Sequence, residues 1–428
     1  MASAGLDFET LDYYTEPRLI NDPNPYFEHL RAKAPVTPLP YHGVVAVTGY
    51  EEAVQVYTDI DTFSSVNAVT GPFPPVPFPI DGNDISSKIE SWRPDLPMKD
   101  QIVSFDQPRH GPARSLMMRL FTPSRLKQNE AFLWTLSDQL IDRFWASGTV
   151  EVVRDYGVPF AGMVIADLLG VPEEDRPTFA DHFGGGSRLP SVNEADRAKE
   201  RNPLIFLHSA FAGYLEDRRR APRQDILSEL ANGKFPDGSM PELQEVINVA
   251  TFMFGAGQDT TARLLAAAMQ VLAEDWELQD RVRGDASLIN DFVEEILRLE
   301  GPVKTSHRLV RKRTTLGGVE LMPGTHVALL NGAINRDPRR FEAPNSIRLD
   351  RPRSKEHIGF GRGAHTCPGA PLARAETRVS LTRLLARMGD IRISDEHHGP
   401  AGARVFNHEP TYILRGLEQL RLTFTPLS

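Results

Sequence analysis

The stretch FGRGAHTCPGAPLARAE, residues 360–376, contains Cys367, the only cysteine among 428 residues. Three glycines, Gly361, Gly363 and Gly369, lie close to it, and residues 370–388 follow with helical periodicity. A lone cysteine can be an inert core residue, a thiolate nucleophile or a metal ligand. The sequence around Cys367 is needed to distinguish these roles.

The setting of Cys367 argues against an inert core residue. Pro368 suits an early helical position, which would place the sulfur at a helix N-terminus, where the dipole and free N–H groups favour a thiolate. The three glycines remove side chains on both sides of it and leave room for a broad, flat ligand. A nucleophile would need a base, and His365 is a candidate, but no hydrolase or phosphate-binding motif accompanies it. Ligation to iron fits better.

Composition restricts the class of protein. Apolar residues make up 40% and charged residues 25% of the chain, as in soluble globular proteins. One cysteine cannot form an internal disulfide, a Cys-rich zinc site or a four-Cys iron–sulfur cluster. The N-terminus lacks a signal-peptide pattern and no apolar run is long enough to span a membrane, so we expect a cytoplasmic protein without a membrane anchor. The net charge of −9 disfavours nucleic-acid binding.

The pattern along the chain predicts one domain, residues 1–428, that is mainly helical with a smaller β-rich portion. Residues 66–100 are rich in proline and are predicted to form a long loop that acts as a lid. Strands are expected in residues 44–50 and 314–330, where Gly317-Gly318 suits a hairpin turn and Pro323-Gly324 a type II turn.

Residues 243–276 are apolar nearly all round and predict a long helix through the interior. Within it, Gly255 and Gly257 are unfavourable in a helix, and Asp259 is unfavourable in an apolar run. The Thr260 hydroxyl can donate to the carbonyl of Ala256 and bend the helix. An acid beside an alcohol suits a proton relay, and a kink with a satisfied buried carboxylate is the equal alternative.

Glu295 and Arg298 are three residues apart on one face of a second predicted helix. On most helices this spacing gives a surface ion pair, so the pair alone is weak evidence of function.

Together, these motifs resemble the cytochrome P450 family of haem-thiolate monooxygenases. Residues 360–369 match its Phe-Gly-x-Gly-x-His-x-Cys-x-Gly haem loop at every fixed position. Residues 256–261, AGQDTT, match its oxygen-activation helix, and Glu295–Arg298 its Glu-x-x-Arg pair. Residues 110–114, HGPAR, match its helical His-x-x-x-Arg, and residues 335–351 look like its meander. Order and spacing agree over nearly the whole chain, which implies the P450 fold with haem between the long helix and the cysteine loop.

The resemblance implies haem b, protoporphyrin IX iron, with Cys367 as the thiolate ligand of the metal and O2 as co-substrate. Asp259 and Thr260 match the acid–alcohol pair that feeds protons to bound dioxygen. The implied cofactor-binding residues also include four that match positions usually bound to the haem propionates, namely His110, Arg114, Arg308 and His365, together with Phe360, Gly361, Gly369 and Ala256.

The meander departs from the family pattern of Pro-x-Arg-Phe, whose arginine closes a triad with the Glu-x-x-Arg pair. Here Pro344 is followed by Asn345, Ser346 and Ile347. Arg348 and Arg351 are both candidates for the missing cation, and the sequence does not decide between them.

The chain resembles the bacterial type of P450 that receives electrons from NAD(P)H through ferredoxin reductase and ferredoxin. Arg374 matches a position used for ferredoxin docking, and we expect a monomer. The positions that usually contact substrate are occupied by Phe73, Phe78, Phe254, Val303, Thr305, Tyr412 and Ile413. Such a lining suits a terpenoid, a fatty or branched-chain lipid, or a steroid.

Three other functions compete with an O2-dependent hydroxylase. A peroxide-driven enzyme of the same family would tend to lack the pair formed by Asp259 and Thr260. A non-catalytic haem or hydrophobe carrier gives no reason for that pair, and a cysteine hydrolase predicts a reactive thiol without haem.

Overall fold

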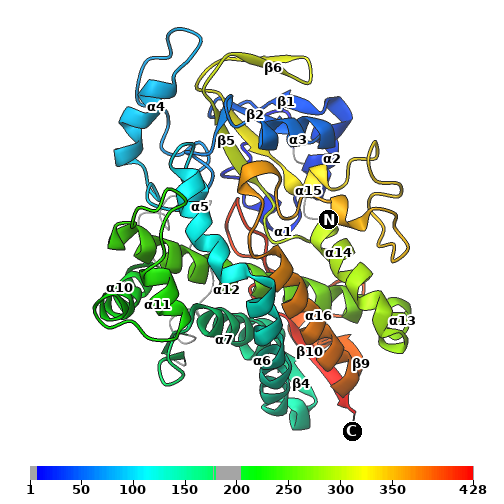
Figure 1. The fold of residues 1–428 in the computed structure, drawn as a ribbon. Helices are drawn as coiled ribbons and strands as arrows, with labels where there is room; N and C mark the ends of the chain where they lie inside the picture. Colours follow the sequence, from blue (N-terminus) through cyan, green and yellow to red (C-terminus); the bar gives the residue numbers. More distant parts are fainter. Residues whose placement is uncertain (1–6, 177, 180–203, 428) are drawn as a thin grey trace.

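The computed structural model describes residues 7–176, 178–179 and 204–427. Figure 1 shows two regions, a helical one around the long helix α12 and a β-rich one that carries β1, β2, β5 and β6. The prediction of a mainly helical chain with a smaller β portion is confirmed. Within the described residues, no helix is long and apolar enough to cross a membrane.

The helices extend over most of the described chain. Their bounds are α1 Arg18–Asn21, α2 Asn24–Lys33, α3 Tyr50–Thr58, α4 Ser86–Trp92, α5 His110–Met118, α6 Pro123–Asp142, α7 Val158–Leu169, α10 Leu204–Arg220, α11 Ile226–Ala231, α12 Leu243–Glu274, α13 Trp276–Gly284, α14 Ile289–Leu299, α15 Asn331–Ile334, α16 Ala370–Arg387 and α17 Asp395–His398.

Helix α12 is the central element of the helical region. It begins with a capping box in which the side chains of Glu242 and Glu245 each accept a hydrogen bond from the other's backbone N–H. It packs against α5, α7, α10 and α16, and most of its apolar side chains are buried. The long buried helix expected from the apolar run is therefore confirmed, and it positions Asp259 and Thr260 near its middle.

The strands form three sheets. Their bounds are β1 Val36–Pro38, β2 Val44–Val47, β3 Phe63–Ser64, β4 Thr149–Glu151, β5 Ser306–Val310, β6 Thr314–Leu316, β7 Val319–Leu321, β8 His326–Leu329, β9 Met388–Ile393 and β10 Arg421–Pro426. The largest sheet has the order β1-β2-β8-β5-β3, in which β2 and β8 are parallel, and β9, β10 and β4 form a second sheet. Gly317 and Gly318 have φ of +55° and +83° in the two-residue turn between β6 and β7, as predicted.

The predicted loop of residues 66–100 is wrong for Ser86–Trp92, which form helix α4. Ile89 and Trp92 lie three residues apart and are both buried, packed in a small cluster with Val66 and Leu309. This segment contains neither proline nor glycine and can form a short amphipathic helix. The loop is predicted because the residues on both sides of it are rich in proline.

Candidate cofactor and active site

Cys367 lies in a tight loop between α15 and α16. Its backbone N–H donates to the carbonyl of Phe360 at 2.9 Å, which closes the loop. Gly361 and Gly363 have φ of +66° and +67°, and a Cβ on Gly363 would lie 2.4 Å from the Tyr57 carbonyl oxygen. Only glycine fits there. The helix after the loop begins at Ala370, so Pro368 lies outside it, contrary to the prediction.

The electrostatics of the Cys367 sulfur are a balance of opposing effects. Burial raises the pKa of the thiol above its ordinary value, although the backbone N–H groups of Gly369 and Ala370 and the nearby Arg114 act in the opposite direction. The expected preference for a thiolate at the helix terminus is therefore outweighed by desolvation in the free thiol. A metal ion that binds this sulfur removes its proton directly.

Four cationic or titratable side chains, implied by the resemblance, meet beside the loop. The rings of His110, from α5, and His365 lie 4.1 Å apart between centroids. Burial and the neighbouring cations lower the pKa of both imidazoles, to about 2 for His365. Both rings are therefore neutral at pH 7, and Arg114 and Arg308 carry the positive charge of this group.

Among the described residues, Arg114 and Arg308 have no acidic partner. Arg114 Nη2 donates to the Thr366 carbonyl at 2.6 Å, and Arg308 Nη1 donates to the His307 carbonyl at 2.7 Å. In the described part of the chain, no carboxylate lies within ion-pair distance of either guanidinium. Arg308 is buried, so its charge is costly without an anion.

The middle of α12 carries an exposed surface on an otherwise buried helix. Ala256 is exposed and Gly255 and Gly257 are partly exposed. The Thr260 hydroxyl donates to the Ala256 carbonyl at 2.9 Å, the hydrogen bond expected from the sequence. The carboxylate of Asp259 is bound by Arg263 Nη2 at 3.0 and 3.2 Å.

Arg263 also binds Glu409, and neither of these residues was predicted. A signal for Arg263 was present, because it lies four residues after Asp259 in an apolar run and can therefore pair with it along the helix. No such signal existed for Glu409, which comes from a loop 146 positions further along the chain.

Glu295 and Arg298 form a buried ion pair, at 2.8 Å, with both side chains 0% exposed. The pair is therefore not one of the surface ion pairs that this spacing gives on most helices. Arg351 Nε donates to Glu295 at 2.7 Å, whereas Arg348 offers Glu295 only its backbone N–H and directs its side chain to Glu342 and Asp350. The structure thus selects Arg351 as the third member of the network.

Arg374, on α16, is engaged within the chain. Its guanidinium binds both carboxylate oxygens of Glu294, at 2.5 and 2.9 Å, and lies 4.7 Å from the Phe360 ring centroid. The side chain is 30% exposed, so part of it still reaches the surface beside the cysteine loop.

The residues expected to contact substrate separate into three groups. Five lie together with the N-terminal tyrosines, where the Tyr13 and Thr305 hydroxyls bond at 2.5 Å and the Tyr412 hydroxyl donates to the Thr70 carbonyl. Phe78 packs on Trp92 instead. Phe254 is 0% exposed in the main core, where it packs on Phe179. The five that lie together are Phe73, Val303, Thr305, Tyr412 and Ile413.

Residues 209–389 match the family model described as Cytochrome P450. Cytochrome P450 144 of Mycobacterium tuberculosis is 32% identical, over 94% of this chain and 89% of that protein. The chain belongs to the cytochrome P450 family. P450 homologues are monooxygenase oxidoreductases, and the family implies haem with a cysteine thiolate ligand.

Two solved P450 structures show how closely the fold agrees. The substrate-free cytochrome P450 CYP150A6 of Mycobacterium marinum is 52% identical, covers 99% of this chain and 100% of its own, and superimposes with a TM-score of 0.93. CYP109E1 of Bacillus megaterium, in complex with corticosterone, is 27% identical over 94% and 98% of the two chains, with a TM-score of 0.77. The P450 fold is therefore confirmed.

The residues of this P450 fit a haem. Ala256 is exposed on α12, and a Cβ on Gly369 would lie 3.8 Å from the Cys367 sulfur, so glycine at this position brings no side chain against the sulfur. The two arginines without acidic partners match the two carboxylates that a haem carries.

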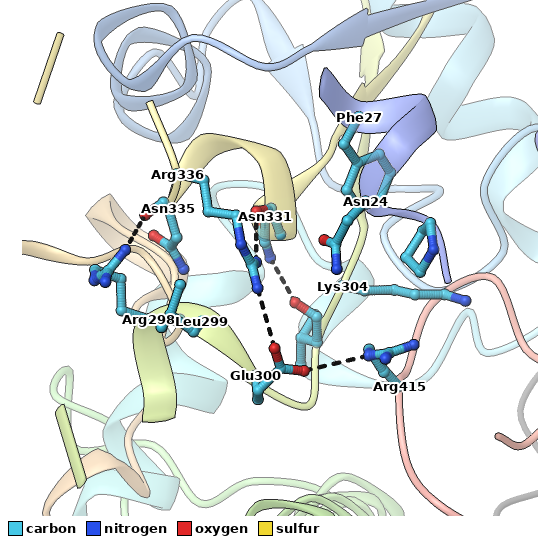
Figure 2. A pocket seen from close by; sticks show the side chains of 15 residues that line it. Asn24, Phe27, Arg298, Leu299, Glu300, Lys304, Asn331, Asn335, Arg336 and Arg415 are labelled. Carbon is cyan, nitrogen blue, oxygen red and sulfur yellow. Dashed lines mark hydrogen bonds and ion pairs between the residues drawn. The ribbon is translucent and has the colours of Figure 1, made fainter. Parts of the chain in front are cut away.

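A separate pocket lies between the start of α2, the end of α14 and the C-terminal loop, residues 399–420 between α17 and β10 (Figure 2). Glu300 binds Arg336 at 3.0 Å and Arg415 at 3.4 Å across it. Of the predicted residues, it contains only Val303 and Arg298. Lys304 also lines it and is buried.

Proposed function

We propose that this P450, acting as one catalytic domain over residues 1–428, uses O2 to oxidise an apolar small molecule. Its electrons come from NAD(P)H through ferredoxin reductase and ferredoxin in the cytoplasm. The observation that carries the proposal is the arrangement of Asp259 and Thr260 beside the exposed Ala256 surface of α12.

In this proposal the Cys367 thiolate would hold the iron of a bound haem. Bound haem with a thiolate ligand supplies the electron density that favours cleavage of the O–O bond. Arg114 and Arg308 would bind the propionates, with the neutral rings of His110 and His365 beside them. The Nε2 of His365 is hydrogen-bonded to the Ser65 hydroxyl at 3.0 Å. Phe360, Gly361, Gly369 and Ala256 form the surfaces that contact the macrocycle.

Thr260 and Asp259 move protons. Because the Thr260 hydroxyl donates to the Ala256 carbonyl, its oxygen lone pairs are available to accept a donor at the exposed surface of α12. The Asp259 side chain is 22% exposed, so water can reach its carboxylate. In this proposal Asp259 and Thr260 would together supply protons at the exposed surface of α12, the carboxylate on the side open to water and the hydroxyl on the side of Ala256.

The substrate class is a terpenoid, a fatty or branched-chain lipid, or a steroid. Four of the five candidate residues that lie together are apolar or aromatic, the type of side chain that binds a ligand by burial of apolar surface. In this structure they are packed in a core with the N-terminal tyrosines. The corticosterone complex of CYP109E1 shows that a P450 of similar fold accepts a steroid.

Arg374 is the proposed contact for ferredoxin. It lies seven residues after Cys367, on the surface side of the loop. A ferredoxin carboxylate has to compete with Glu294 for its guanidinium, so other exposed cations contribute to docking.

The test has two parts. The reduced protein under carbon monoxide is expected to show the red-shifted Soret band of thiolate-ligated haem, and Cys367→Ser is expected to abolish it. Thr260→Ala is expected to keep haem and substrate binding but to release most electrons as peroxide instead of product. Unchanged product per electron in Thr260→Ala would contradict the proton relay, and efficient turnover with peroxide alone would favour the peroxide-driven enzyme.

A further inference from the structure

Arg263 lies one helical turn after Asp259 on α12, and its side chain is 4% exposed. The two oxygens of Asp259 both accept from Nη2, at 3.0 and 3.2 Å, and Glu409 accepts from the same nitrogen. The other nitrogens, Nε and Nη1, have no hydrogen-bond partner among the described residues. One buried nitrogen thus connects the acid of α12 to the C-terminal loop.

The C-terminal loop holds Arg263 by shape as well as by charge. The Glu409 N–H donates to the Gly416 carbonyl at 3.0 Å, which places Glu409 and Gly416 side by side. A Cβ on Gly416 would lie 2.2 Å from Arg263 Nη1 and 2.6 Å from its Cγ. The guanidinium therefore lies directly on the Gly416 backbone and has no room to move in that direction.

Arg263 lies among other cationic side chains, which explains why Glu409 is needed as a second carboxylate beside Asp259. Lys304 is 5% exposed, and burial together with Arg415 and Arg263 lowers its pKa to about 7. Glu300 already binds Arg415 (Figure 2). Glu409 supplies the negative charge that keeps Arg263 in place in these cationic surroundings, beyond what Asp259 provides.

We propose that Arg263, held by Glu409 and the Gly416 backbone, is the positioning residue that orients the Asp259 carboxylate for proton delivery to Thr260. This inference rests on the proposed role of Asp259 in proton delivery. It makes the loop that contains Glu409 and Gly416 a part of the support of the proton relay, although neither residue touches the reacting atoms.

The single shared nitrogen makes a specific prediction. A lysine ammonium at position 263 can bind both carboxylates, because only one nitrogen of the arginine is used. Arg263→Lys is therefore expected to keep most of the product formed per electron consumed. Arg263→Met keeps the apolar stem but removes the charge, and it is expected to lower that ratio about tenfold, with substrate Kd unchanged.

Gly416→Ala tests the same idea without removal of a polar group. Gly416 does not have a positive φ, so alanine is compatible with the backbone, and its Cβ displaces Arg263. The expected result is a several-fold loss of product per electron, with the carbon monoxide spectrum intact. Gly284→Ala is the matched control, since a Cβ on Gly284, at the end of α13, meets nothing within 4 Å.

Asp259→Asn separates the two levels of the proposal when it is measured with the same reconstituted ferredoxin system and substrate. Normal product per electron in Asp259→Asn would overturn the proposed relay itself. Loss in Asp259→Asn but normal ratios in Arg263→Met and Gly416→Ala would overturn only the positioning role. We expect product per electron to fall in Arg263→Met and in Gly416→Ala and to be largely retained in Arg263→Lys. We also expect the double variant Asp259→Asn/Arg263→Met to lose no more than Asp259→Asn alone.

Discussion

Two ion-pair networks of this P450 have opposite designs. In the first, one acid, Glu295, is shared by two arginines, Arg298 and Arg351. In the second, one arginine, Arg263, is shared by two acids, Asp259 and Glu409. Both connect a helix to a segment far away in the sequence, yet they differ in burial and in how completely their hydrogen bonds are satisfied.

The Glu295 network is closed. Glu295 and Arg298 are 0% exposed, and Arg298 also donates to the carbonyls of Asn335, Pro344 and Ser346. The Arg263 network is open, because two nitrogens of Arg263 lack partners in the described residues and Asp259 is 22% exposed. A closed network fixes the fold of the meander, whereas an open one leaves its acid accessible to water.

The largest effect is expected from breaking the closed network. Glu295→Gln leaves two buried guanidinium groups without their anion, and we expect the free energy of unfolding to fall by about 3–5 kcal/mol. Thermal unfolding of the purified holoprotein measures it. A loss below about 1 kcal/mol would contradict a buried network in which Glu295 neutralises both arginines.

The buried acid Glu376, on α16, extends the comparison, since among the described residues it has a hydroxyl partner and no ion pair with an arginine. Thr261 Oγ1 donates to it at 2.9 Å, and burial raises its pKa from 4.5 to about 8. The folded chain therefore holds one more proton than the unfolded chain between pH 4.5 and 8. Stability falls as the pH rises through this range and levels off above it.

The test for Glu376 compares the free energy of unfolding of the wild type and of Glu376→Gln as a function of pH. We expect Glu376→Gln to remove about 2–4 kcal/mol of the pH-dependent loss of unfolding free energy between pH 5 and 8. Parallel stability–pH curves for the wild type and the variant would contradict a neutral acid at this position.

A smaller effect is expected from the choice between the two meander arginines. Arg351→Met removes a charged hydrogen bond to Glu295 but leaves Arg298, so a loss of about 1.5–3 kcal/mol is expected. Arg348→Met is the control, because its side chain binds only Glu342 and Asp350, which are largely exposed. Equal losses in the two variants would contradict the assignment of Arg351.

The smallest effect is expected at an exposed pair outside both networks. Arg313 binds Glu320 across the β6–β7 hairpin, with the two side chains 49% and 57% exposed. Arg313→Ala is expected to change the free energy of unfolding by less than about 1 kcal/mol in thermal unfolding. A larger loss would mean that burial does not explain the difference between the networks.

The sequence predicted what local patterns and a family motif determine. The long helix, the hairpin at Gly317-Gly318 and the hydrogen bond from Thr260 follow from spacing within one segment. The burial of Glu295 and Arg298 could not be predicted from their spacing, because exposed ion pairs on helices have the same spacing. The contact between Arg263 and Glu409 depends on how the C-terminal loop returns to α12, which only the tertiary structure determines.

The parallel pairing of Val44–Val47 with His326–Leu329 has a consequence for the order of events in the cell. During synthesis, the first of these segments leaves the ribosome long before its parallel partner exists, so it can pair with β1 but its other edge stays unpaired. Such a high contact order slows folding and keeps an apolar strand exposed to other nascent chains. We therefore expect the largest sheet to form only after translation is nearly complete, and chaperone supply to limit the yield of the enzyme.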